Sequence, residues 1–200
     1  MYTQDYLRLI ALLVVMTINL SLLALVGEKR NVIEGLLGKI MPIMKPNQGL
    51  LEGPVQFNNP GNIETGQGYA GETGETYAER FSVFDSPQMG VRAVARDITT
   101  KIGRHKGDLY KIIKNYLSDE SENDINAYFN FVKKEVGTDK VTEGDLPSIV
   151  KSIIKMENGI DSDLTKLYLS DDVFKEAIDL SKISLPSEFT LEDARKKLNE

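Results

Sequence analysis

The chain has 200 residues, a formal net charge of -6, one histidine and no cysteine. Without cysteine it offers no thiol nucleophile, no disulfide and no thiolate metal ligand, and a lone histidine leaves a zinc site short of nitrogen ligands. The acidic balance lacks the basic footprint of a nucleic-acid-binding protein. We therefore expect no metal, no cofactor and no nucleic-acid partner, in a chain long enough for one domain plus an extension.

The first part of the chain is strongly apolar. Residues 7–26 are hydrophobic apart from Arg8 and three uncharged polar residues, and a stretch of about twenty such residues can cross a bilayer as a helix. No small-x-small cleavage pattern precedes Gly27. We therefore predict an uncleaved membrane anchor at residues 1–26. Its orientation stays open, because basic residues stand on both sides of it.

A linker and a β region are expected next. Residues 27–53 contain five glycines and two prolines, a pattern typical of a tether. The domain starts near Pro54, where the turn-rich segments NNPGN, TGQG and AGETG lead to strand-forming residues at 77–84. These features predict a small β-hairpin region. In NNPGN, Gly61 is expected to adopt a backbone angle that only glycine reaches without strain.

The rest of the domain is predicted to be helical, since apolar residues recur at helical spacing behind capping residues. Asp85 and Ser86 are expected to begin the first of these helices, and Asp108 and Ser121 to cap the next two. Helices are thus predicted at residues 87–103, 109–116, 122–136, 147–157, 172–181 and 191–198. The predicted fold class is mainly α with a small β-hairpin region.

One carboxylate stands where acids are uncommon. Ile149, Ile153 and Glu157 follow one another at spacings of four residues, so Glu157 shares the apolar stripe of its helix at the last turn. Partial burial disfavours the charged form, and a glutamate with a raised pKa is what a glycosidase uses to protonate the leaving oxygen of a sugar. The simpler alternative is that the side chain bends out to solvent, because helix ends are wet.

Five segments stand in order along the chain: NNPGNI at 58–63, AGETG at 70–74, FSVFDSPQMGVRA at 81–93, ENDINAYFNFV at 122–132 and SIIKMENG at 152–159. In this order they resemble a phage group of virion structural proteins and lysozyme-like peptidoglycan hydrolases. The likeness implies a lysozyme-like α+β domain at residues 54–160. It covers neither the anchor nor residues 161–200, which we expect to form a C-terminal helical extension.

The order of these segments differs from that of the enzymes they resemble. In lysozyme-like enzymes and bacterial glucosaminidases the catalytic glutamate stands on a helix, as E-S/N-G, ahead of the β region. Here MENG follows that region, so the resemblance implies a circular permutation, which can keep a site because chain ends in compact domains often lie close together. It implies that Glu157 is the catalytic acid of a lysozyme or a lytic transglycosylase.

The second carboxylate of such a site is less clearly marked. Glu64, Glu72, Glu75 and Glu79 all lie in the hairpin region. We assign the role to Glu72, because it stands between turn glycines in AGETG, where a loop can aim a side chain into a cleft. Enzymes that expel the product by internal ring closure use a single acid, so a second catalytic carboxylate is not required.

Amide and aromatic side chains near these segments are the expected sugar-binding residues: Asn59, Asn62, Tyr69, Asn123 and Tyr128. Amides match sugar hydroxyls as donors and acceptors, and aromatic rings stack on sugar rings. Each also has a structural explanation. Asparagine beside glycine or proline forms turns and caps, and aromatic residues near a strand, Tyr77 among them, are more often core.

Together these inferences predict a phage endolysin or virion-associated enzyme that is anchored through residues 7–26 and cleaves the glycan strands of peptidoglycan. We expect it in the host inner membrane with its domain in the periplasm, or in the virion with other virion proteins as partners. The alternative is a virion structural or ejection protein that keeps the fold without catalysis and inserts its hydrophobic helix into the host envelope, because a shared fold does not establish activity.

Overall fold

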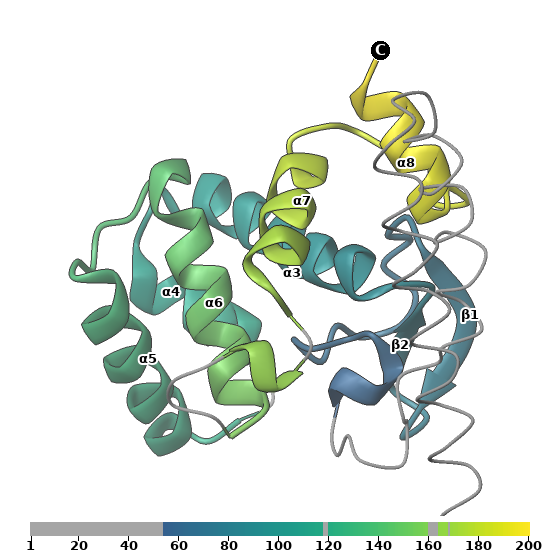
Figure 1. Ribbon diagram of the computed structural model, residues 1–200. Coiled ribbons are helices and arrows are strands. Elements are labelled where there is room, and N and C mark those ends of the chain that lie inside the picture. The colour runs from purple at the N-terminus through teal and green to yellow at the C-terminus, as the bar shows by residue number, and fades with distance from the viewer. Residues whose placement is uncertain (1–53, 118–119, 160–163, 168) are drawn as a thin grey trace, which may run out of the picture. The chain divides into compact units, whose positions relative to one another are not determined.

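The computed structural model describes residues 54–117, 120–159, 164–167 and 169–200. In these ranges the chain forms helices and one two-stranded antiparallel sheet, which confirms the predicted class of a mainly α domain with a small β-hairpin region (Figure 1). The elements in chain order are η1 (Pro54–Phe57), β1 (Glu72–Tyr77), β2 (Phe81–Phe84), α3 (Pro87–His105), α4 (Leu109–Tyr116), α5 (Glu122–Val136), η2 (Glu143–Asp145), α6 (Leu146–Glu157), η3 (Leu164–Leu167), α7 (Asp171–Ser181) and α8 (Leu191–Leu198).

The predicted anchor at residues 1–26 and the predicted linker at residues 27–53 lie outside the described residues. None of the helices in the described part is both long and apolar enough to cross a membrane.

Helices α3, α4 and α5 begin at capping residues that the sequence indicates, except that Asp85 does not cap α3. Asp108 accepts the N–H of Lys111 at 3.1 Å, and Ser121 caps α5 in the same way. At the start of α3 the cap is Ser86, whereas Asp85 accepts the N–H of Leu191 at 3.0 Å. Asp85 therefore fastens the start of α8 to the start of α3.

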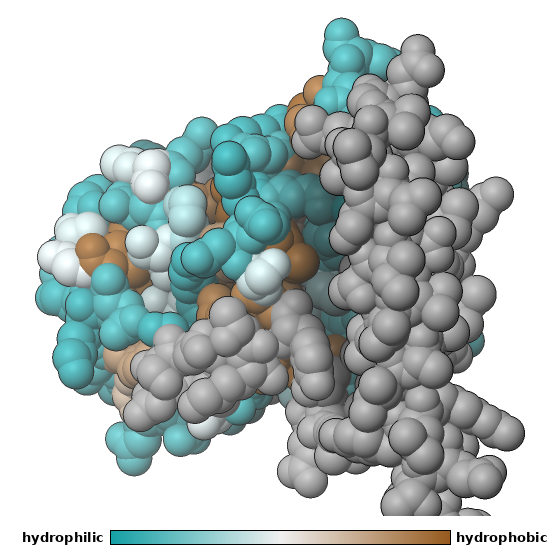
Figure 2. Space-filling model, in the orientation of Figure 1, coloured by the Kyte–Doolittle hydropathy of each residue, from teal (hydrophilic) through white to brown (hydrophobic). Residues whose placement is uncertain are grey.

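Helix α3 is the centre of the core. It contacts α4, α6, α7 and β2, and Figure 1 shows it passing behind α7. Its inward residues Val91, Val94, Ala95 and Ile98 are fully buried, as their helical spacing predicts. Outside the grey atoms, the face in Figure 2 is mainly hydrophilic, and Leu198 is the exposed large hydrophobic residue in the described part of the chain.

The segment predicted as a C-terminal extension contributes to this same core. Helix α7 lies against α3 and buries Phe174, Ala177 and Leu180. The buried guanidinium of Arg92 on α3 donates from Nε to the carbonyl of Leu180 and from Nη2 to that of Ile183, each at 3.1 Å. A buried cation is tolerated here because carbonyl groups at and just after the end of α7 accept its N–H groups.

The hairpin differs in detail from the prediction. Residues 77–84 were expected to form a strand, but a turn after Tyr77 divides them, and Tyr77 pairs with Phe81 in the antiparallel ladder. Ala78 and Glu79 in this turn have φ values of 48° and 55°. The left-handed region usually selects glycine or asparagine, so neither residue signals the turn in the sequence.

Candidate active site

The NNPGN segment forms a turn that is tied to both the hairpin and the helices. Asn59 is fully buried, with its amide nitrogen donating to the carbonyls of Ile63 at 2.9 Å and Ser82 at 2.8 Å. Its Oδ1 accepts the N–H of Ile63 at 2.8 Å. A side chain with these partners and no exposed surface does not reach a ligand. Asn59, predicted as a sugar-binding residue, is instead the structural centre of the turn.

Two glycines allow the turn to lie close to the helices. A Cβ at Gly61 would stand 2.3 Å from Cγ2 of Val94, and a Cβ at Gly90 of α3 would stand 1.7 Å from the carbonyl oxygen of Asn58. The positive φ values of the turn belong to Asn58 and to Asn62, not to Gly61. The prediction that Gly61 needs a backbone angle open only to glycine was therefore wrong. Glycine is required there because a side chain would collide with Val94.

Glu157 stands at the end of α6 and faces this turn. The Asn62 amide nitrogen donates to its Oε2 at 2.7 Å, and the Tyr128 hydroxyl donates to its Oε1 at 2.9 Å. The side chain is half-buried and does not bend away into solvent. Burial raises the pKa of Glu157, the two hydrogen bonds oppose that rise, and the nearby charge of Glu120 adds to it.

Further polar contacts hold the turn against the end of α6. The amide nitrogen of Asn158, the residue after Glu157, donates to the carbonyl of Pro60 at 2.7 Å. The Tyr116 hydroxyl of α4 donates to the carbonyl of Gly61. The residue that follows the acid and a side chain of α4 are therefore both bound to the same turn, which limits the movement of the turn relative to the Glu157 carboxyl.

A cleft of about 310 Å³ opens beside Glu157. Its lining is a mixture of charged, amide and aromatic side chains with a few apolar ones, from the turn, the hairpin, α3, α4 and the end of α6: Gly61, Asn62, Ile63, Glu64, Gln67, Tyr69, Arg80, Phe81, Asp97, Lys101, Asn115, Tyr116, Leu117, Glu120 and Glu157. Polar groups beside aromatic rings are suited to a hydroxyl-rich ligand.

The structure brings some predicted site residues together and leaves others apart. Asn62 and Tyr69 line the cleft with Glu157, and Tyr128 lies behind the acid. Glu72 does not line the cleft, because its carboxylate turns back to accept the N–H of Tyr69 at 3.1 Å. Asn123 is exposed in the first turn of α5, away from the cleft lining.

Three carboxylates other than Glu72 share the cleft with Glu157. Glu64 is paired with Arg80 at 2.5 Å, and Asp97 is paired with Lys101. The third, Glu120, is exposed and has no ion-pair partner among the described residues. Within the described part of the chain, no three acidic or histidine side chains gather closely enough to hold a metal ion.

Sequence reasoning missed several residues that build the site. Tyr116 and Asp97 lie on helices whose apolar spacing gave no reason to assign them to the site, and Tyr77 was expected to stack on a sugar ring or, as is commoner for such residues, to be core. The Tyr77 hydroxyl donates to Oδ1 of Asn62, on the opposite side of that amide from Glu157. Asn158, which also builds the site, did have a signal in the sequence, because it stands inside the MENG segment beside the predicted acid.

Comparison with known proteins relates the chain to a phage protein. No protein-family model matches the chain. Protein P5 of Pseudoalteromonas phage PM2 is 31% identical to it over 112 residues, a match that spans 52% of this chain and 70% of P5. Identity at this level over more than two thirds of P5 shows common ancestry, and the chain therefore belongs to the family of phage protein P5.

Proposed function

We propose that this protein cleaves the glycan strands of peptidoglycan, with Glu157 as the general acid. The observation that carries the proposal is the half-buried Glu157 carboxyl at the cleft, held by two neutral donors, Asn62 and Tyr128. A carboxyl in this setting keeps its proton at a higher pH than an exposed one. It can then give the proton to a glycosidic oxygen as the bond from that oxygen to the sugar carbon breaks.

Tyr128 suits an acid that gains and loses a proton. Its hydroxyl donates to Glu157 Oε1 at 2.9 Å and lies 3.4 Å from the carbonyl of Ile153. When Glu157 is protonated, the same hydroxyl can turn to Ile153 and accept from the acid, because a hydroxyl both donates and accepts. The Tyr128 hydroxyl therefore keeps a hydrogen-bond partner in both charge states of Glu157.

The lining of the cleft and the family of the chain support a glycan substrate. Asn62, Gln67 and Asn115 present amides and Tyr69 presents an aromatic ring, the groups that bind sugar hydroxyls and sugar rings. The relative P5 is a phage protein, and a phage has to pass the bacterial cell wall. P5 carries no activity in its name, so the rival function is a virion structural or ejection protein that keeps the fold without catalysis.

Glu120 replaces Glu72 in the proposal as the second carboxylate. It lines the cleft, carries no ion pair within the described residues and interacts electrostatically with Glu157, whereas Glu72 faces its own loop. In hydrolysis Glu120 takes a proton from the attacking water.

Glu120→Gln should lower hydrolysis by about 100-fold or more, and Glu72→Gln by less than about threefold. Equal rates for the Glu120 variant and the wild type would leave Glu157 as a single acid.

The test of the proposal is incubation of the full-length protein with purified peptidoglycan, followed by mass analysis of the products. Reducing ends indicate hydrolysis, and anhydro ends indicate internal ring closure. Glu157→Gln should fold normally and lower cleavage by roughly 100- to 10,000-fold, since glutamine has no proton to donate. A loss under tenfold removes Glu157 as the acid. No products from the wild type favour the structural protein.

We also propose that residues 7–26 keep this activity at the host inner membrane or in the virion. About twenty apolar residues match the thickness of the hydrocarbon core. Full-length protein should stay in the membrane fraction after alkaline washing, whereas protein lacking residues 1–26 should be released. Equal release of the two proteins would contradict the anchor.

A further inference from the structure

Tyr77 of β1 does not contact Glu157 itself but contacts Asn62, which does. Its hydroxyl donates to Oδ1 of Asn62, and the amide nitrogen of Asn62 donates to Glu157 Oε2 at 2.7 Å. We infer that Tyr77 is a positioning residue, which acts through Asn62 to keep an N–H donor directed at the Glu157 carboxyl. The inference rests on the proposed function only for the consequence in catalysis.

The packing of the Tyr77 ring fixes where its hydroxyl points. The ring is stacked on Phe57 with centroids 4.2 Å apart and an interplanar angle of 6°, and it lies 5.2 Å from the ring of Phe81. Burial raises the pKa of the Tyr77 hydroxyl, so it keeps its proton and remains a donor. The donor to Asn62 is therefore held in place by aromatic contacts that do not involve the hydroxyl itself.

The Tyr77 hydroxyl matters because the two ends of the Asn62 amide have opposite hydrogen-bonding roles. One end of the Asn62 side chain donates and the other accepts, and the two ends differ little in shape. With the hydroxyl of Tyr77 on Oδ1, the NH₂ group is the end that faces Glu157. Without that hydroxyl the amide is free to turn its oxygen toward the carboxyl, an arrangement that favours the protonated acid.

Asp97 and Lys101 of α3 line the cleft beside Glu157, as do Glu64 and Arg80. Four titratable groups interact electrostatically with Glu157: Tyr128 on α5, Tyr116 on α4, Glu120 in the loop after α4 and Tyr77 on β1. Glu120 is the member of this set whose charge raises the pKa of Glu157. Tyr77→Phe changes none of the other three, so a change in the titration of Glu157 in that variant reports on the hydroxyl of Tyr77.

The experiment compares wild type and Tyr77→Phe in the full-length protein, by titration of the Glu157 carboxyl carbon in NMR and by the pH profile of kcat/KM on peptidoglycan. The pKa of Glu157 should rise by about half a unit to one unit, because a hydrogen bond to the charged form is weakened. The basic limb of the profile should move up with it. On the acid plateau of the profile, where Glu157 is protonated in both proteins, kcat should fall several-fold because the carboxyl is held less firmly in place, with KM nearly unchanged.

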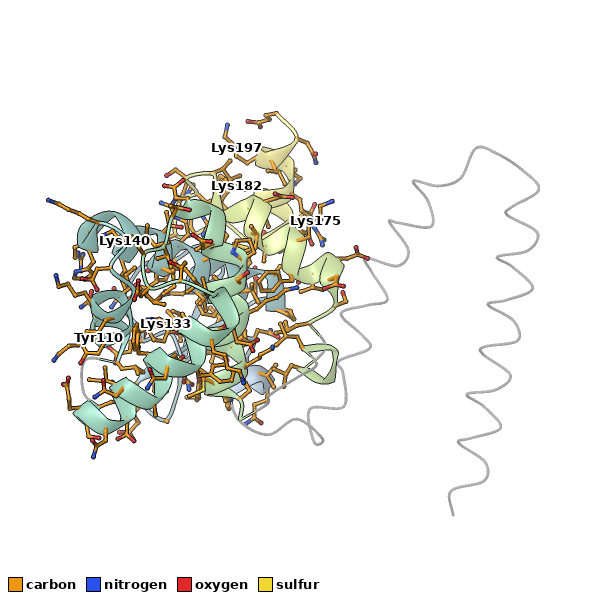
Figure 3. The ribbon with its side chains drawn as sticks, turned by 90° about the vertical axis from the view of Figure 1, so that its left-hand side faces the viewer. Tyr110, Lys133, Lys140, Lys175, Lys182 and Lys197 are labelled. Carbon is orange, nitrogen blue, oxygen red and sulfur yellow. The ribbon has the colours of Figure 1, made fainter. Side chains whose placement is uncertain are left out.

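Tyr110→Phe is the matched control. The Tyr110 hydroxyl also donates to a neighbouring side chain, Glu122, but it lies on the outer side of the helical region and not in the cleft lining (Figure 3). Removing it should move neither the titration of Glu157 nor the pH profile. A shift of equal size in both variants would show that the loss of any hydroxyl has this effect, and would overturn the inference.

The remaining outcomes separate the inference from the proposed function. An unchanged Glu157 titration in folded Tyr77→Phe overturns the inference. A raised pKa in a protein whose wild type releases no products supports the inference and refutes the proposed function.

If Tyr77→Phe does not fold, Asn62→Asp takes its place, because aspartate accepts the φ of 51° and sets a second carboxylate beside Glu157. The pKa of Glu157 should then rise by more than about one unit. No rise would show that residue 62 does not face the Glu157 carboxyl, and would overturn the inference.

Discussion

The helices and the NNPGN turn of this protein are held in different ways. A helix such as α5 begins at a neighbouring cap, Ser121, and is buried through apolar residues at regular spacing. The turn has almost no apolar side chains, and its polar groups are bound by residues far along the chain. These ties run from Asn59 to Ser82, from Pro60 to Asn158, from Gly61 to Tyr116 and from Asn62 to Glu157. The scaffold thus depends on local pattern, and the placement of the acid depends on long-range hydrogen bonds.

The largest effect expected from this difference is that of Asn59→Ala. It removes three hydrogen bonds and leaves a buried N–H at Ile63, so the free energy of unfolding should fall by about 3 kcal/mol or more. Ser121→Ala removes one cap at an exposed helix start and should cost about 1 kcal/mol. Denaturant unfolding of both variants measures the two values. Equal losses would mean that the turn is no more dependent on its polar contacts than a helix is.

Close approach between the two regions gives the next effect, at Gly90 of α3. Alanine there would set a Cβ 1.7 Å from the carbonyl oxygen of Asn58, and overpacking against backbone should cost about 2 to 3 kcal/mol. Gly103→Ala in the same helix is the control, since its Cβ meets no atom within 4 Å and should stabilise the helix by about 0.5 to 1 kcal/mol. Melting temperatures should therefore move in opposite directions. A stabilised Gly90→Ala would contradict the contact between turn and helix.

The smallest effect concerns the dependence of stability on pH. Burial raises the pKa of Glu157 in the folded protein, so folding favours its protonated form. The stability that this contributes is complete below the unfolded pKa and is lost as the pH rises through the folded value. As the pH rises through this range, the melting temperature of Glu157→Gln should therefore increase relative to that of the wild type. The increase should be smaller than the changes expected for Asn59→Ala and Gly90→Ala. Glu79→Gln, at an exposed turn, supplies the baseline. A constant difference at all pH values would argue against the raised pKa.

The helices could be predicted because their signals are local. Leu191–Leu198 follows directly from a cap and from apolar spacing, and the bounds of Leu109–Tyr116 agree with the prediction for the same reason. The burial of Glu157 was also accessible, since its place on the apolar stripe of α6 depends only on residues four and eight positions before it. Helical periodicity carries that information within a single element.

The rest of the site could not be predicted, because it depends on which distant residues meet. Asn59 has the composition of a ligand-binding amide, and only its partner at Ser82 in β2 shows that it is structural. The direction in which Glu72 turns is set by the fold of its own loop. Glu120 enters the cleft through the packing of α4 and α5, which no spacing along the chain specifies.

The position of α7 after the residues of the cleft along the chain bears on the order of events during synthesis. Residues of α7 cover α3, and the carbonyls of Leu180 and Ile183 accept the N–H groups of the buried Arg92. A ribosome releases the amino-terminal part first, so α3 and the turn against it emerge well before their cover does. We expect α3 of the nascent chain to keep its α7-facing side uncovered, and the guanidinium of Arg92 to lack these two acceptors, until the residues of α7 have left the ribosome. All the residues that line the cleft are then synthesised before the helix that completes the packing of α3.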